Sequence, residues 1–558
     1  MNPAETAAFS PSEPAGPRRR RLPAVTAGLA LAVSLTSLVF HLVFATHAGG
    51  LWRDEINSIG VATLPTLGDV WNHLQFGSYP ILWMLLLRLL AGLGLAGDPA
   101  LRTCGLLIGL GTIGAFWWAA RAFRSPPPLV ALVLFALSPS VIWWGDSNGA
   151  TGLGVLLIVV TAGLIWRVAA APSPGRTAAA ALLAVASVQC HYYNSVLLFG
   201  LCVGGAAVAV RQRRWRGALL VLGLGALAAV TMLPYLAVFA RLGEFSMFFK
   251  GEPFGFQPFW TELNEALRPA GAWVIWLWVA VLGLALAVGL TAVLRPAAFR
   301  LSSDRRDVCL FALVALVTGG LAYYFFLLVL NYPTHPWYYL ALLAHVAVLS
   351  DVILAVALAA FPALRVGCLT LAVVAAVGLA PKAGPASALR LTNVDLLVAK
   401  LRTLVTAGDL VIVNPWYAGI TYERYNDLPA DWTTLPPIPF HHYHRMDLFK
   451  LQMMAPDQTA PMRPVLEQIQ RTLAGGHRVY FTGGLHFLAR GQILAQLPPA
   501  PQRSTGWNDI PYLYAWMLQA TILLQNHAGR VSLVEVPVAY PVNPYENLTL
   551  VQVEGWRN

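Results

Sequence analysis

Residues 22–58 read LPAVTAGLALAVSLTSLVFHLVFATHAGGLWRDEINS, a long apolar run followed directly by two adjacent carboxylates. From Leu22 to Ala45 nearly every side chain is apolar, over a length that suits a transmembrane helix. Asp54 and Glu55 follow at the membrane edge, where carboxylates are costly unless they face water, a partner or a substrate. The pair is therefore the first candidate for chemistry. The alternative is a solvated loop with a helix cap.

The composition predicts an integral membrane protein. Of 558 residues, 57% are hydrophobic and only 11% are charged, and the mean hydropathy is +0.61. Soluble domains carry about 25% charged residues. Long apolar runs recur from Leu22 to Ala380. We therefore expect a polytopic α-helical bundle of about 11 to 13 spans.

Arginine clusters between the apolar runs indicate which loops face the cytoplasm. One cluster, Arg18 to Arg21, precedes the first run, so residues 1–21 are predicted to be a cytoplasmic tail rather than a cleaved signal peptide. Further clusters account for much of the net charge of +11, which therefore does not indicate nucleic-acid binding. This rule places Asp146 outside. Simple helix counting, with two helices between Gly77 and Arg121, places it inside. Either one of those two helices is short or re-entrant or the charge rule fails locally, and we favour Asp146 outside.

The long apolar runs end near Pro381, and the rest of the chain has the mixed polar and apolar composition of a soluble domain. Residues 22–380 are predicted to form the transmembrane catalytic domain, and residues 381–558 a soluble α/β domain. Asp409 to Val413 and Arg478 to Thr482 are typical of buried strands, and amphipathic helical segments lie between and after them. If the last span runs outward, this domain is extracytoplasmic. The five cysteines lie in apolar segments and indicate no disulfide framework.

Polar segments interrupt several of the apolar runs. They are Asp146 with its neighbours, His191-Tyr192-Tyr193-Asn194, and Asn331 to Pro336. Irregular backbone at membrane depth is tolerated only where protein or a water-filled cavity covers it. Each interruption alone is typical of a helix end. Together with Asp54 and Glu55 they predict one polar cavity at the outer surface.

Four short motifs, in this order along a multi-span chain, resemble the GT-C glycosyltransferases that use polyprenyl-phosphate sugars, in particular bacterial relatives of protein O-mannosyltransferases and of the lipid A aminoarabinose transferase. The motifs are Trp52-Arg53-Asp54-Glu55, Ser78-Tyr79-Pro80-Ile81-Leu82-Trp83, Leu137-Ser138-Pro139 followed by Asp146, and Gln189-Cys190-His191-Tyr192-Tyr193. Two departures stand out. The second motif lacks the family's His and first Pro, and Trp337-Tyr338-Tyr339 stands where many relatives have Arg-Tyr.

The resemblance implies transfer of a hexosyl or pentosyl group from a polyprenyl-phosphate donor to an acceptor hydroxyl of a glycan, lipid or protein. The reaction would take place at the outer face of the cell's inner (plasma) membrane, with inversion, and without a cofactor, a metal or nucleic acid. Asp54 would act as general base, Glu55 would hold the loop or the acceptor, and Asp146 would orient the base's partner or the sugar. The candidates for binding the donor phosphate and sugar are Arg53, His191, Tyr192, His335, Tyr338 and Lys250.

Two other classes of protein stay open. A transporter or lipid flippase would also have broken helices and buried carboxylates, although no inverted repeat is evident here. A catalytically degenerate scaffold of the same fold is consistent with the altered motifs. The His-rich stretch Phe440 to His444 has no carboxylate or Cys at a recognised metal spacing, so it does not by itself predict a metal site.

Overall fold

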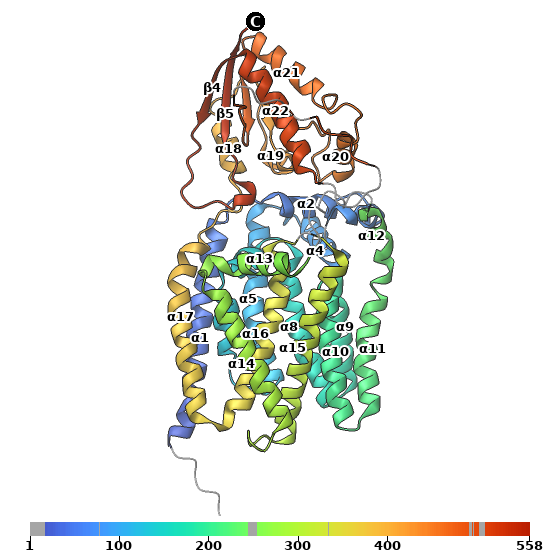
Figure 1. The fold of residues 1–558 in the computed structure, drawn as a ribbon, viewed down its shortest axis with the longest axis vertical. Coiled ribbons are helices and arrows are strands. Elements are labelled where there is room, and N and C mark those ends of the chain that lie inside the picture. The colour runs from blue at the N-terminus through green and yellow to red at the C-terminus, as the bar shows by residue number, and fades with distance from the viewer. Residues whose placement is uncertain are drawn as a thin grey trace, which may run out of the picture.

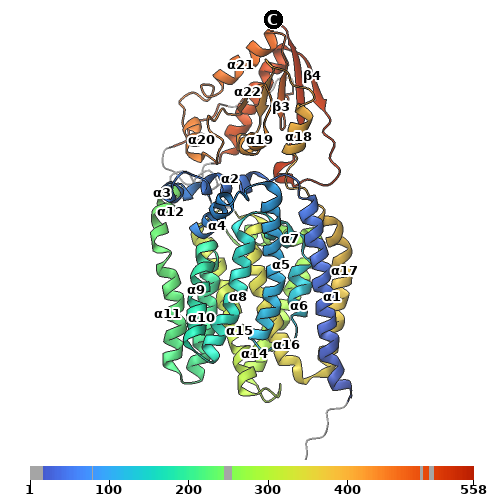
Figure 2. The same cartoon turned by 180° about the vertical axis from the view of Figure 1, so that it is seen from behind.

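A computed structural model describes residues 17–77, 79–243, 254–332, 334–489, 494, 496–501 and 508–558, with side chains from residue 23 onward. A bundle of long helices carries a smaller mixed domain, formed by the last third of the chain, on one end (Figure 1). We call this end the domain face and the other end, from which α1 starts, the opposite face. The view from behind shows the same two layers (Figure 2).

Nine described helices are long and apolar enough to cross a membrane, and a bent pair makes a tenth crossing. The long helices are α1 (Pro17–His47), α5 (Asp98–Ala122), α8 (Ala150–Ala170), α10 (Asn194–Arg211), α11 with α12 (Trp215–Val230 and Leu236–Gly243), α14 (Val274–Leu294), α15 (Ser303–Leu330), α16 (Leu340–Ala357) and α17 (Pro362–Ser387). The polytopic helical fold is confirmed. α9 (Pro174–Cys190) has 17 residues and is left out of this count, but it runs from Arg176 at the opposite face to His191 at the domain face. With α9 the described crossings number eleven, at the lower end of the expected 11 to 13, whereas α4 (Ile81–Gly92) has only 12 residues and does not add one.

The short helix α4 settles the conflict over Asp146. Twelve residues make a helix of about 18 Å, well short of a hydrocarbon core of about 30 Å. The chain therefore stays near the domain face until α5 crosses. It returns through the bent pair, Leu129–Ala136 and α7 (Pro139–Asp146), which meet at 75°. The backbone N–H of Asn148 then donates to Glu55 Oε1 at 2.6 Å, so Asp146 and Glu55 lie at the same face, as the arginine pattern predicts.

Short helices cover the bundle at the domain face. They are α2 (Arg53–Ala62), α3 (Leu67–Asn72) and α13 (Phe256–Leu267). Both views show α2 between the bundle and the C-terminal domain; α3 lies next to it in Figure 2, and Figure 1 shows α13 at the upper end of the bundle. This layer positions the candidate site, because α2 begins with the Arg53-Asp54-Glu55 sequence.

The C-terminal domain is built on a five-stranded sheet of order β2-β1-β3-β5-β4. The strands are β1 (Leu410–Val413), β2 (Asp431–Thr434), β3 (Val479–Thr482), β4 (Ala528–Val534) and β5 (Leu550–Trp556), and the helices are α18 (Val394–Leu401), α19 (Gly419–Tyr425), α20 (Met446–Met453), α21 (Arg463–Ala474) and α22 (Ile510–His527). β1 is parallel to β2 and β3, whereas β5 pairs antiparallel with β3 and β4. The α/β character is confirmed. The change of character expected at Pro381 falls inside α17, which ends at Ser387.

Candidate active site

Glu55 is buried and holds the start of α2 together. Its side chain is 1% exposed. Oε2 accepts the backbone N–H of Trp52 at 3.0 Å, and Oε1 accepts Arg102 Nη1 and the Asn148 N–H at 2.6 Å each. Arg102 also donates to the Gly50 carbonyl at 2.6 Å, so α5 clamps the loop that enters α2. With both oxygens engaged, Glu55 positions the loop rather than reaching a substrate.

Asp54, one residue earlier, is in the opposite situation. Its side chain is 39% exposed, and among the described residues its one ion-pair contact is with Arg53 Nε at 3.4 Å. Because Asp54 lies in the first turn of α2, the unpaired N–H groups at the helix start favour its negative charge. Of the adjacent carboxylates, Asp54 is therefore the one that remains available for chemistry.

Aromatic and imidazole side chains from three parts of the chain interact electrostatically with Asp54. They are Tyr79 before α4, Tyr332, His335 and Tyr338 between α15 and α16, and His444 of the C-terminal domain. Burial is the main reason why the pKa of Tyr332 is raised and that of His335 lowered, so both side chains are neutral at pH 7. The group brings side chains that can donate hydrogen bonds into the neighbourhood of one carboxylate.

A row of stacked rings continues from this group into the break between α9 and α10. Tyr338 stacks on Tyr193 at 5.4 Å between centroids, Tyr193 lies 5.2 Å from His191, and His191 lies 6.2 Å from Tyr79. His191 thus joins the candidate site, as the sequence predicts. Tyr192 instead faces Tyr235 and Phe239 of the α11–α12 segment. Lys250 and Ser78 lie outside the described residues.

The C-terminal domain covers Arg53. The guanidinium lies 4.4 Å from the centroid of the Tyr417 ring and donates to the Tyr545 carbonyl at 3.2 Å. The backbone N–H of Arg53 donates to Glu546 Oε2 at 3.2 Å, and burial raises the pKa of the Glu546 carboxyl to about 7. Sequence reasoning did not assign Tyr417 or Glu546 to the site, because nothing local connects them with Arg53.

The His-rich stretch of the C-terminal domain is divided between different partners. The backbone N–H of His444 donates to Asn57 Oδ1 at 2.8 Å, and its Nε2 lies 3.2 Å from the Tyr417 carbonyl oxygen. The ring of His441 packs on Trp432 at 4.5 Å. Within the part of the chain that the structure describes, no group of three or more His, Cys, Asp or Glu side chains could hold a metal ion.

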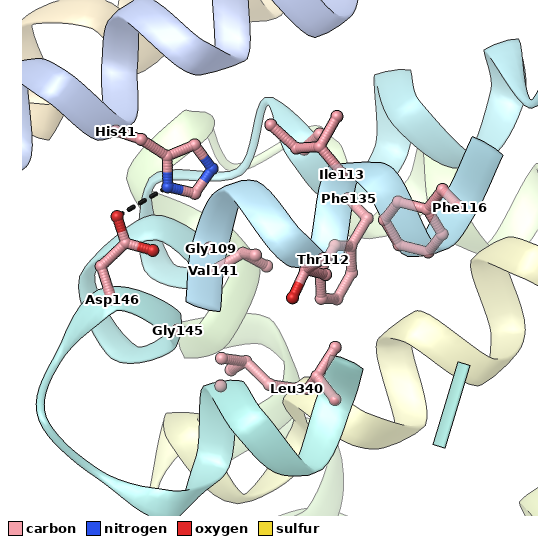
Figure 3. Close-up of a pocket in the computed structure, with 13 residues that line it drawn as sticks. His41, Gly109, Thr112, Ile113, Phe116, Phe135, Val141, Gly145, Asp146 and Leu340 are labelled. Atoms are coloured by element: carbon pink, nitrogen blue, oxygen red, sulfur yellow. Dashed lines mark hydrogen bonds and ion pairs between the residues drawn. The ribbon is translucent and has the colours of Figure 1, made fainter. Parts of the chain in front are cut away.

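Asp146 is buried in a separate place, between α1, α5 and α7. Its Oδ2 lies 2.6 Å from His41 Nδ1, and both side chains line a small apolar cavity of about 20 Å³, room for about one water (Figure 3). A Cβ on Gly109 would come within 2.0 Å of Asp146 Oδ1, so this glycine permits the close contact. The structure does not bring Asp146 into the group around Asp54, and its contact with His41 ties α7 to α1.

The arrangement of spans, short surface helices and C-terminal domain is the GT-C fold of membrane glycosyltransferases. The crystal structure of ArnT from Cupriavidus metallidurans bound to undecaprenyl phosphate matches over 95% of this chain and 97% of that one, with a TM-score of 0.50 and 14% identity. Two structures of the Archaeoglobus fulgidus oligosaccharyltransferase match with TM-scores of 0.42 and 0.44 at 12% identity, over 81% and 82% of this chain and 67% and 69% of theirs. No family model and no curated protein matches the sequence.

Proposed function

We propose that the protein is a glycosyltransferase that moves a sugar from a polyprenyl-phosphate donor to an acceptor hydroxyl at the domain face. The observation that carries the proposal is Asp54, an accessible carboxylate in the first turn of α2, with Tyr332 and His335, two neutral side chains, in its neighbourhood. The fold supports it, since ArnT, which shares that fold, was solved with undecaprenyl phosphate bound. The acceptor would be a glycan, a lipid or a protein.

In this mechanism Asp54 is the general base. Its carboxylate takes the proton of the acceptor hydroxyl while that oxygen bonds to the anomeric carbon of the sugar. The bond from this carbon to the phosphate oxygen breaks at the same time, which inverts the anomeric centre and leaves polyprenyl phosphate. A positioned base of this kind contributes about a hundred- to ten-thousand-fold to the rate.

The departing phosphate needs donors, because its negative charge grows as the bond breaks. We assign this role to Arg53, with Tyr332, Tyr338 and His335 as neutral donors. Arg53 is the only cation that forms an ion pair with Asp54 among the described residues, and its guanidinium is held by Tyr417 and the Tyr545 carbonyl. These tyrosines would partly replace the arginine that many relatives carry before the late span.

We also propose that the domain face is extracytoplasmic and that the bundle lies in the plasma membrane. The support is the arginine distribution, since arginines of the inter-helix connections gather at the opposite face and such residues mark cytoplasmic loops. The N-terminal tail would then be cytoplasmic, although its residues 1–16 lie outside the described structure.

The test uses purified full-length protein in liposomes, a labelled polyprenyl-phosphate sugar and membranes of the source cells as the acceptor. Wild type should transfer label and release polyprenyl phosphate, whereas Asp54→Asn should lose transfer by a factor of a hundred or more. Asp431→Asn, at an exposed carboxylate of β2, is the matched control and should keep full activity. Full activity in Asp54→Asn would show that Asp54 is not the general base. Absence of turnover by wild type would favour a transporter or a degenerate scaffold.

A further inference from the structure

A second cavity, of about 580 Å³, opens at the opposite face, far along the bundle from Asp54. This volume lies within the range of sites that bind small molecules. Five arginines line the cavity, and they come from the ends of four different helices. They are Arg121 in the last turn of α5 and Arg124 just after it, Arg167 near the end of α8, Arg176 in the first turn of α9, and Arg305 in the first turn of α15.

The positive charge of this cavity is not balanced from within. The lining includes two carboxylates, Asp304 and Asp307. Asp307 is already engaged, because its Oδ1 accepts Arg211 Nε at 2.5 Å and its Oδ2 accepts Gln212 Nε2 at 2.5 Å. Asp304 makes no ion pair with any described residue. One carboxylate therefore faces five guanidinium groups, which leaves a surplus of positive charge.

Three of the arginines have side chains available for a ligand. Arg121, Arg124 and Arg305 form no side-chain hydrogen bond or ion pair with the residues that the structure describes. The other two are held in place: Arg176 donates to the Ala171 carbonyl at 2.7 Å, and Arg167 lies 5.6 Å from the centroid of the Trp118 ring. A guanidinium group is the side chain best suited to bind phosphate oxygens in pairs.

Apolar side chains line the cavity together with the arginines. Phe123, Trp166, Val308 and Val356 line it, from the ends of four different spans. An amphiphile would thus meet both charged donors and an apolar surface. Basic pockets between helices at this face of a membrane bind the head groups of anionic lipids.

Membrane topology alone explains why arginines lie at this face, but not why they converge. Arg213 and Arg300 belong to the same face and do not line the cavity. Both have a positive φ, 56° and 50°, close to the 53° of Arg124. These two arginines share the charge, the face and the backbone conformation of Arg124 and differ in where they lie, so they provide a matched control.

We propose that this cavity binds a phosphate-bearing anion through Arg121, Arg124 and Arg305, independently of the transfer reaction at the domain face. The shared chemistry is a phosphate or phosphodiester group with a single or double negative charge. It has two sources, the head group of an anionic phospholipid or a soluble phosphate compound. The apolar wall favours the lipid.

The experiment measures the unfolding midpoint of the full-length protein in a neutral detergent while a probe is titrated. The probes are phosphatidylglycerol, phosphatidylcholine and inorganic pyrophosphate. Phosphatidylglycerol should raise the midpoint of wild type, and phosphatidylcholine should not. The double substitution Arg121→Gln/Arg124→Gln should weaken the apparent affinity roughly thirtyfold, since each basic group contributes a factor of about five. The control, Arg213→Gln/Arg300→Gln, should respond as wild type does.

If pyrophosphate alone stabilises wild type, and the Arg121→Gln/Arg124→Gln variant loses this response, the phosphate site is supported and its ligand is a soluble phosphate compound. Equal responses of the cavity variant and the control would overturn the proposal, and so would equal stabilisation by phosphatidylcholine. If the double variant does not fold, the single substitution Arg305→Gln serves the same comparison. Loss of transfer activity in Asp54→Asn leaves all these outcomes unchanged, so the two proposals fail separately.

Discussion

The adjacent carboxylates Asp54 and Glu55 should respond in opposite ways when each is converted to its amide. Glu55→Gln removes the charge that Arg102 requires, and the Arg102 side chain is only 8% exposed. Removing one partner of a buried ion pair costs about 3–5 kcal/mol. A glutamine oxygen can still accept from Arg102 and the Asn148 N–H, but its NH₂ group then meets the Trp52 N–H, donor against donor.

Asp54→Asn leaves all of these contacts intact. Its side chain is 39% exposed, and its ion-pair partner, Arg53, keeps its contacts with the Tyr545 carbonyl and the Tyr417 ring. A substitution of this kind changes the stability by about 0.5 kcal/mol or less. The same variant should lose transfer by at least a hundredfold, because the amide cannot accept the acceptor's proton.

The assay follows unfolding by tryptophan fluorescence for wild type and both variants in the same detergent, with transfer measured on the same samples at low temperature. We expect Glu55→Gln to unfold several degrees earlier and to lose activity in proportion to the fraction that is unfolded. We expect Asp54→Asn to unfold with wild type and to be inactive. A Glu55→Gln protein that is as stable as wild type but inactive would refute the structural role of Glu55 and move the base to that residue.

Three further predictions concern packing, pH and topology. Gly109→Ala should destabilise the protein by about 1–3 kcal/mol in thermal unfolding, because the new Cβ would lie 2.0 Å from Asp146 Oδ1. The control, Gly114→Ala on the same helix, meets nothing within 4 Å and should unfold as wild type does. Burial raises the pKa of Glu546 from 4.5 to about 7, so the folded state favours the protonated carboxyl. About 3 kcal/mol of the free energy of unfolding should therefore be lost as the pH rises from about 4.5 to above 7. Glu546→Gln should flatten this part of the plot of unfolding free energy against pH. A reporter that works only outside the cytoplasm, fused after Asn558, should be active, and activity of a cytoplasmic reporter there would reverse the orientation.

The local parts of the fold could be predicted from the sequence. Long apolar runs gave the spans, and the apolar runs around Val411 and Phe481 gave strands β1 and β3, because burial on both faces leaves a clear pattern. β2, Asp431–Thr434, was missed because it is a short, polar strand at the edge of the sheet. The depth to which α4 enters the membrane was also open, since a mostly apolar run that contains Arg88 fits a short span or a helix that turns back.

The division of labour within the site could not be predicted, because it depends on partners that are distant in sequence. The sequence left open whether Glu55 holds the loop or the acceptor, and Arg102, which lies 47 residues further along, pairs with it in the buried loop. Asp146 was expected beside Asp54, yet His41, 105 residues away, holds it in another cavity. Sequence identifies a carboxylate at the right depth in the membrane, whereas only the packing of helices decides which carboxylate remains accessible.

The hydrogen bond from the Arg53 N–H to Glu546 has a consequence for biosynthesis. Its two ends are 493 residues apart, so the loop bearing Asp54 emerges from the ribosome long before the residue that completes it. At about 5–20 residues per second, that interval is roughly 25 to 100 s. A chain cut short by a nonsense mutation or proteolysis could insert its first spans normally and still have an unfinished site. If the proposed function holds, a molecule that lacks the end of the chain also lacks this contact at its candidate site.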